Sequence, residues 1–104
     1  MRVLLAAACL AATTSLALAH GDAMWIQLGS YRGPDGSHCC GEQDCFRVPR
    51  EAAQAGPAGY VVNWRGRDYT IPYQQALVSE NDDFWVCEKG DQTPRCFFAP
   101  PMGA

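Results

Sequence analysis

The segment His38–Cys45, HCCGEQDC, holds the residues best suited to chemistry: three cysteines and a histidine within eight positions. Two further cysteines, Cys87 and Cys96, follow near the C-terminus. Thiols can pair as disulfides, attack other disulfides or bind soft metals, and the cellular compartment decides which of these uses is open. The N-terminal residues therefore have to be interpreted first.

The N-terminus has the order of a secretory signal peptide: Arg2, an apolar stretch from Val3 to Ala12, and the small-residue cleavage site Ala17-Leu18-Ala19. We expect residues 1–19 to be removed and residues 20–104 to form one small domain in the periplasm or outside the cell. The alternative is a buried N-terminal helix. An apolar stretch this short does not span a bilayer, which needs about 20 residues, so no membrane span is predicted.

Export favours disulfides, and the expected mature chain has an odd number of cysteines, five. The predicted pairs are Cys87–Cys96, across a hairpin, and Cys40–Cys45, closing a short loop. Cys39 is then a free thiol, which would favour a covalent homodimer. An alternative joins Cys39 or Cys40 to the C-terminal hairpin and so closes a far longer loop.

Three other uses of the cysteines compete with structural disulfides. Thiol–disulfide exchange generally uses a C-x-x-C motif at a helix N-terminus, and this sequence has no such motif. A zinc site would be built from His38, Cys39, Cys40, Cys45 and a distant cysteine, although adjacent ligands such as Cys39 and Cys40 are unusual and zinc ligands are usually two to four residues apart. A strained vicinal Cys39–Cys40 disulfide would act as a redox or ligand-sensing switch. Structural disulfides are the leading hypothesis.

Cleavage after Ala19 would make His20 the first residue. Its α-amine and imidazole can bind one copper ion together, and His38 can supply a second imidazole. This pair resembles the histidine brace of copper-dependent polysaccharide oxygenases and of periplasmic copper carriers. The resemblance implies copper binding or delivery, because a chain of this length is too short for the oxygenase fold. Copper is the only cofactor that we predict, as an alternative to none.

Aromatic side chains offer a different kind of site. Leu, Ile, Val and Phe together number only 13 in residues 20–104, so the core is thin and the larger rings are needed to fill it. Rings that packing does not use can bind a sugar or a peptide. The predicted aromatic face consists of Trp25, Trp64, Trp85, Tyr60 and Tyr69.

Charge and the remaining motifs exclude several functions. The net charge is −3, and the basic residues are scattered, so neither nucleic acid nor an anionic membrane is an expected partner. The sequence has no G-x-S-x-G motif and only two histidines, so no catalytic triad is indicated. The acidic run around Asp82 is typical of a solvated turn. No catalytic residue is predicted.

Short strands are the elements that would position these residues. Two runs rich in β-branched and aromatic residues, Tyr60–Trp64 and Asp68–Ile71, flank Arg65-Gly66-Arg67 and predict a hairpin. Phe84–Glu88 and Arg95–Phe98 predict a second hairpin, in which two cysteines face each other.

Helical signals are weak. Arg50–Ala55 predicts about two helical turns before Gly56-Pro57, and Pro72–Leu77 predicts one. The expected fold is therefore mainly β: a small disulfide-stapled antiparallel meander of four to five short strands with one or two short helical turns.

The cysteine block follows the turn sequence Pro34-Asp35-Gly36, and the last strand reads Arg95-Cys96-Phe97-Phe98. In these features the chain resembles an uncharacterised family of small exported, cysteine-rich bacterial proteins, which have a CC-x4-C block after a PDG turn and a C-terminal RCFF-like strand. The resemblance spans Trp25 to Met102 and implies export and compactness, but no activity. We expect an exported non-enzymatic domain, a binding or structural accessory protein of the periplasm. A copper-binding protein is the second hypothesis and a small enzyme the third.

Overall fold

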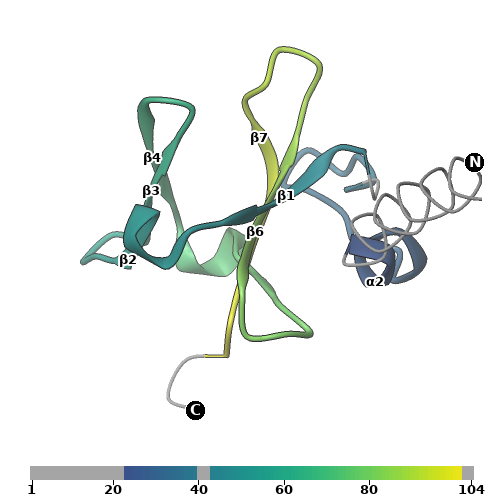
Figure 1. Cartoon of the computed structure of the whole chain (residues 1–104), viewed down its shortest axis with the longest axis horizontal. Coiled ribbons are helices and arrows are strands. Elements are labelled where there is room, and N and C mark those ends of the chain that lie inside the picture. Colours follow the sequence, from purple (N-terminus) through teal and green to yellow (C-terminus); the bar gives the residue numbers. More distant parts are fainter. Residues whose placement is uncertain (1–22, 40–42, 102–104) are drawn as a thin grey trace, which may run out of the picture.

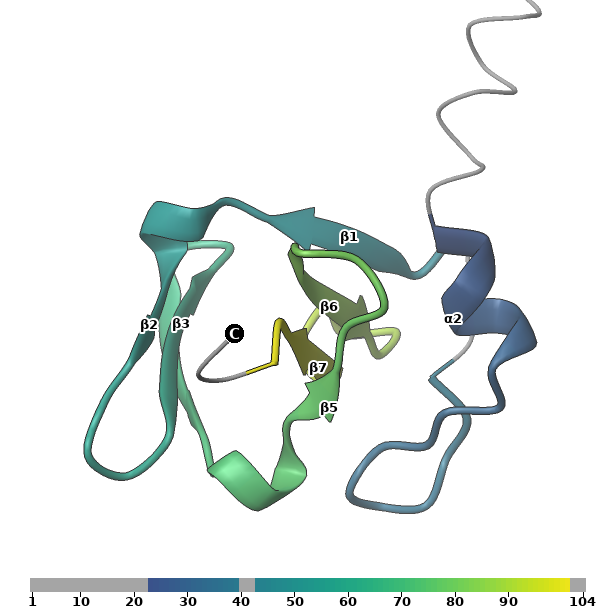
Figure 2. The same ribbon diagram turned by 90° about the horizontal axis from the view of Figure 1, so that it is seen from below.

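The computed structural model describes residues 23–39 and 43–101, and Figures 1 and 2 show their arrangement from two directions. Strands dominate this part of the chain, which is mainly β as predicted. In chain order the elements are helix α2 (Met24–Leu28), strand β1 (Cys45–Val48), 3₁₀ turn η2 (Arg50–Ala52), strands β2 (Ala53–Ala55), β3 (Tyr60–Trp64) and β4 (Arg67–Ile71), 3₁₀ turn η3 (Tyr73–Gln75), and strands β5 (Leu77–Val78), β6 (Phe84–Glu88) and β7 (Pro94–Ala99).

The seven strands of the described ranges form two sheets. One sheet has the order β1-β6-β7-β5 and the other has the order β2-β3-β4. Paired strands are antiparallel except β5 and β7, which run parallel. The predicted meander has fewer strands because β2 and β5 are only three and two residues long, too short to show an alternating pattern.

The helix predicted for Arg50–Ala55 is wrong beyond its first turn. Only η2 is helical, and the second half of the segment is β2, in which Ala53 lies opposite Val62 of β3. Ala53 is 5% exposed, so burial against β3 overrides the helix propensity of the segment. The single turn predicted within Pro72–Leu77 is present as η3.

The first predicted hairpin is β3–β4, with the two-residue turn Arg65-Gly66. Both turn residues have positive φ, 51° and 80°. This is a type I′ turn, whose twist matches that of the strands that it joins. In the register of this hairpin Trp64 lies opposite Arg67 and Val62 lies opposite Tyr69, so these four side chains share one face of the small sheet.

The four-stranded sheet is covered on both faces, as the end-on view in Figure 2 shows. On one face, which we call the disulfide face, Trp85 and Phe98 pack with Ile26 of α2 and with four cysteines. On the other, the sandwich face, Val86 and Phe97 pack against the three-stranded sheet. Burial on both faces explains why β6 and β7 are almost continuously apolar instead of alternating.

Two neighbouring disulfides hold the disulfide face. Cys39 is bonded to Cys96 and Cys45 to Cys87, over sequence separations of 57 and 42 residues. The Cys45 Sγ lies 3.5 Å from the carbonyl oxygen of Cys39, so the two bridges are adjacent. In the chain-entropy model a loop of either length contributes about 4 kcal/mol when taken alone.

The predicted pairs Cys87–Cys96 and Cys40–Cys45 are wrong, and Cys39 is not a free thiol. The predicted register is right, since Cys87 does lie opposite Cys96. However, Cys87 also lies opposite Cys45 on its other side, with the two Cα atoms 3.9 Å apart, and it bonds to that neighbour. A cysteine in a middle strand has two candidate partners, so facing across one hairpin does not decide the pairing. The alternative that joins Cys39 to the C-terminal hairpin is confirmed.

The other thiol hypotheses change accordingly. A vicinal disulfide needs the Cys39 sulfur, which is bonded to Cys96, and the zinc site needs thiolates at Cys39 and Cys45, which are both in disulfides, so both hypotheses are wrong. Every cysteine in residues 23–39 and 43–101 is in an intramolecular disulfide, and none of them supplies a thiol for a covalent homodimer. Cys40 lies outside the described residues.

Candidate binding cleft

A cleft of about 220 Å³ opens between the tip of the β3–β4 hairpin and the turn that joins β6 to β7. The two hairpins extend in the same direction in Figure 1, and residues from both of them line the cleft. Its lining mixes two aromatic rings with charged, amide and hydroxyl groups. The lining residues are Trp64, Arg65, Arg67, Tyr69, Asp91, Gln92 and Thr93.

Strand alternation places the β3–β4 side chains at the cleft. Trp64 and Arg67 flank the type I′ turn as a directly opposed pair, and Tyr69 follows Arg67 two residues later on the same face. Arg67 is exposed, and the two rings are partly buried. The aromatic surface of the cleft thus continues into the core between the two sheets.

The opposite wall is the turn Lys89–Thr93. The backbone N–H of Gln92 donates to the carbonyl of Lys89 (2.9 Å), and the carboxylate oxygen Oδ1 of Asp91 accepts from the backbone N–H (3.0 Å) and the hydroxyl (2.6 Å) of Thr93. The hydrogen bond from the Thr93 hydroxyl is the largest cause of the lowered pKa of Asp91. Asp91 is therefore ionised at neutral pH, with one oxygen engaged within its own turn.

Both turns hold a residue other than glycine in the left-handed region. Arg65 has φ 51° and Gln92 has φ 69°, and both line the cleft. Ser30, with φ 58°, is the third such residue within the described ranges. Residues other than glycine are strained in the left-handed region. Such residues tend to occur at functional sites, where their side chain is needed.

Buried Glu88 anchors the cleft to the four-stranded sheet. It is 9% exposed and accepts a hydrogen bond from Trp64 Nε1 (2.6 Å). Arg65 binds both carboxylate oxygens, through Nε to Oε2 and through Nη2 to Oε1 (3.1 Å). The Arg65 guanidinium also lies 5.5 Å from the Trp64 ring and 5.7 Å from the ring of Phe46.

The charge of this pair is mutually stabilised. The hydrogen bond from Arg65 is the largest cause of the lowered pKa of Glu88, and the bond from Trp64 adds to it, whereas burial acts in the opposite direction. The pKa of Arg65 is correspondingly raised by Glu88. Glu88 thus orients Trp64 and Arg65 as a fixed wall of the cleft.

The five predicted aromatic residues do not form one face. Trp64 and Tyr69 line the cleft, and Tyr60, 6% exposed, packs into the core between the sheets. Trp85, 3% exposed, and Trp25 lie on the disulfide face, where their ring centroids are 6.2 Å apart. The prediction fails because the four-stranded sheet separates the two groups of rings.

The copper hypothesis depends on His20, which lies outside the described residues, and it stays a prediction. His38 is half-buried, and its backbone forms a bridge to Arg32. Within residues 23–39 and 43–101 no cluster of three or more metal-binding side chains occurs.

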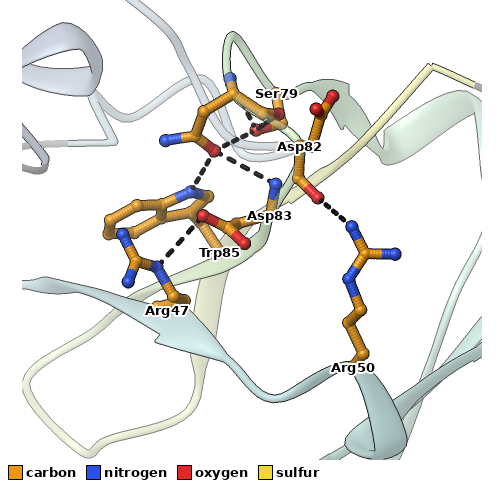
Figure 3. Close-up of polar contacts among 7 residues, drawn as sticks. Arg47, Arg50, Ser79, Asp82, Asp83 and Trp85 are labelled. Carbon is orange, nitrogen blue, oxygen red and sulfur yellow. Dashed lines mark hydrogen bonds and ion pairs between the residues drawn. The ribbon is translucent and has the colours of Figure 1, made fainter.

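A second polar cluster surrounds the turn between β5 and β6 (Figure 3). Trp85 Nε1 donates to Asn81 Oδ1 (2.9 Å), which also accepts from the backbone N–H of Asp83 (3.2 Å). Arg47 lies over the Trp85 ring, 5.3 Å from its centroid, and pairs with Asp83 (3.1 Å). Arg50 donates to the carbonyl of Asp82 (2.8 Å). These contacts fasten the turn to the sheet, so we interpret the cluster as structural.

Sequence reasoning missed Glu88, Arg67 and the turn Lys89–Thr93 as parts of a site. One signal was present: the Asp-x-Thr spacing at Asp91 recurs as Asp35-Gly36-Ser37, which forms the same hydrogen bonds. A second was the lone carboxylate that ends the apolar run FWVCE. Neither signal identifies the opposite wall of a cleft.

No protein-family model, curated protein or solved structure matches the chain. Within the described ranges no helix is both long and apolar enough to cross a bilayer.

Proposed function

We propose that the protein is an exported, non-enzymatic binding domain and that its cleft holds one residue of a saccharide. The observation that carries the proposal is the composition of the cleft, in which Trp64 and Tyr69 lie beside exposed polar groups from a second hairpin. Sugar rings combine apolar C–H faces, which pack on aromatic rings, with hydroxyls, which bind amide, carboxylate and guanidinium groups. Both kinds of partner are present here.

The size and form of the cleft support a small ligand. Its volume of about 220 Å³ is below the range of about 300–1,000 Å³ that is usual for drug-sized ligands. Extended peptides generally dock along a strand edge or in a long groove, with pockets for alternate side chains. A single compact ring suits a short cleft between two turns better.

The pKa values of the carboxyl groups at the cleft support binding without catalysis. The pKa values of Asp91 and of Glu88, directly behind the wall, are both lowered. Glycosidic bond cleavage uses a general acid whose pKa is raised, so that it carries a proton near neutral pH. Neither carboxyl group is suited to that role.

Export is supported by the two intramolecular disulfides, which are typical of oxidising compartments. The proposed signal peptide, residues 1–19, lies outside the described residues. An exported domain with an open polar cleft would meet cell-wall or extracellular saccharides. We therefore place its function in the periplasm or outside the cell.

The proposal is tested by nuclear magnetic resonance on the oxidised protein, produced from the full-length gene and collected after export. Short oligomers of glucose, galactose, glucosamine and glucuronic acid are titrated in, and the signals of the Trp64 indole, Tyr69 and Thr93 are followed. We expect at least one oligomer to shift these signals with a saturable profile.

Tyr69→Ala should weaken that binding several-fold. Thr70→Ala, on the opposite face of the same strand, is the matched control and should leave it unchanged. If none of the oligomers moves the cleft signals, or if the shifts cluster elsewhere on the domain, saccharide binding in this cleft is refuted.

A further inference from the structure

Arg67 differs from the other described arginines of this domain in the partners of its side chain. Residues 23–39 and 43–101 contain six arginines. Five of them have a hydrogen-bond or ion-pair partner within the protein: Arg32, Arg47, Arg50, Arg65 and Arg95. Within the described ranges Arg67 has none, although it lines the cleft. Its guanidinium therefore has its donors available to a ligand.

Within the described ranges no carboxylate forms an ion pair with this guanidinium. Glu88 is bound by Arg65 and Trp64. Asp68 accepts from Asn63 (2.9 Å) on the opposite face of β4. Asp91 lines the same cleft but forms no ion pair with Arg67, and its Oδ1 already accepts two hydrogen bonds from Thr93.

The Asp91 carboxylate is held mainly within its own turn, where Thr93 donates two hydrogen bonds to Oδ1. These hydrogen bonds are the largest causes of the lowered pKa of Asp91, and the positive charge of Lys89, two residues away, adds to them. Among the described charged residues that line the cleft, Arg65 is paired with Glu88 and Asp91 is hydrogen-bonded to Thr93, whereas Arg67 has neither kind of partner. A cationic ligand group would share Asp91 with the Thr93 hydrogen bonds, whereas an anionic group would find an open guanidinium.

Resting on the saccharide-binding function proposed above, we propose that the ligand is an acidic sugar and that Arg67 binds its carboxylate. A guanidinium presents two parallel N–H donors that match the two oxygens of a carboxylate. Trp64 lies opposite Arg67, and Tyr69 follows it on the same face, so a sugar ring could contact the aromatic rings while its carboxylate reaches Arg67. Arg67 is then the residue that sets specificity for charge.

The test compares three forms of one ring, namely glucuronic acid, glucose and glucosamine, with acetate as a carboxylate that lacks a ring. Affinities are measured by the same resonance titration on the oxidised wild-type protein and on the Arg67→Gln and Arg67→Lys variants. Arg32→Gln, an exposed arginine outside the cleft, is the matched control. Unchanged dispersion of the backbone signals verifies that each variant is folded.

Glucuronic acid should bind the wild-type protein about tenfold to a hundredfold more tightly than glucose does. A hydrogen bond to a charged group usually changes affinity by about this factor. Arg67→Gln should reduce this preference to less than twofold, Arg67→Lys should retain part of it, and Arg32→Gln should retain all of it. Acetate should bind more weakly than glucuronic acid, because it lacks the ring.

Distinct outcomes refute the two proposals separately. If glucose and glucuronic acid bind equally well, or if the preference survives in Arg67→Gln, the role of Arg67 is refuted while saccharide binding stands. If acetate reproduces the shifts of glucuronic acid at the same concentration, Arg67 binds carboxylates but the cleft does not recognise a sugar. If no compound shifts the cleft signals, both proposals fail.

Discussion

The two faces of the four-stranded sheet are stabilised by different means. On the disulfide face, two covalent bridges lie beside a cluster of rings in which Trp25 contacts Tyr31, Trp85 and Phe98 edge to face. The sandwich face has no disulfide within the described ranges, and at its open end it is joined to the small sheet through Glu88. The disulfide face thus holds distant parts of the chain together by covalent bonds. The cleft lies at the end of the sandwich face, where the polar contacts of Glu88 join the two sheets.

The largest expected effect is on the disulfide face. Replacing Cys39 and Cys96 together by alanine, which leaves no unpaired thiol from that bridge, should lower the free energy of unfolding by about 3 kcal/mol, because with Cys45–Cys87 intact the bridge closes a loop of about 15 residues. Urea unfolding of the oxidised protein measures the loss, with exposed Val78→Ala as a near-neutral control. A loss below about 1 kcal/mol would show that the Cys45–Cys87 bridge and the ring packing hold this face without the Cys39–Cys96 bridge.

A smaller effect is expected where the sandwich face meets the cleft. Glu88→Gln should lower the free energy of unfolding by about 1–3 kcal/mol. The neutral amide forms no ion pair with Arg65 and offers only one oxygen in place of the two that Arg65 binds. Asp83→Asn is the control, since it breaks an ion pair with Arg47 whose side chains are 51% and 35% exposed, and such pairs contribute at most about 1 kcal/mol. Equal losses for the two variants would mean that Glu88 does not anchor the small sheet.

The pH dependence of stability gives an independent measure of the same anchor. The pKa of Glu88 lies below its ordinary value of 4.5 in the folded protein, so its contribution is complete above that value and is lost as the pH falls through the folded pKa. Wild-type stability should therefore decrease as the pH falls below about 5. Glu88→Gln should show a shallower decrease, with the remainder due to Asp35 and Asp91, whose pKa values are also lowered. Identical pH profiles would contradict this assignment.

Local features of this fold were predictable from the sequence. The Arg65-Gly66 turn and the register that sets Cys87 opposite Cys96 depend on neighbouring residues, and both are present. Features that depend on contacts between residues far apart in the sequence were not predictable. The strand on the far side of Cys87 supplies its disulfide partner Cys45 from 42 residues away, and no local pattern encodes that neighbour.

The same limit applies to the site. Trp64 was predicted to bind a ligand together with Trp85, but alternation along a strand says only that a ring is on one face or the other. Which face is covered depends on how the sheets pack, and packing buries Trp85 while Trp64 reaches the cleft. Arg67 gave no signal at all, because its lack of a partner is visible only when the other arginines have been placed.

The smallest expected effect compares two turns of the same form. In the turn of residues 33–37, Gly36 is left-handed, with φ 84° and open space around it, whereas Gln92 takes the equivalent position at the cleft, with φ 69°. Gln92→Gly should raise the free energy of unfolding by about 0.5–1 kcal/mol by relieving the left-handed conformation, and Gly36→Gln should lower it by a similar amount. Urea unfolding measures both changes. If Gln92→Gly also weakens saccharide binding, the glutamine side chain is retained for the ligand at the expense of stability; if it destabilises the protein, the side chain supports the fold of the turn instead.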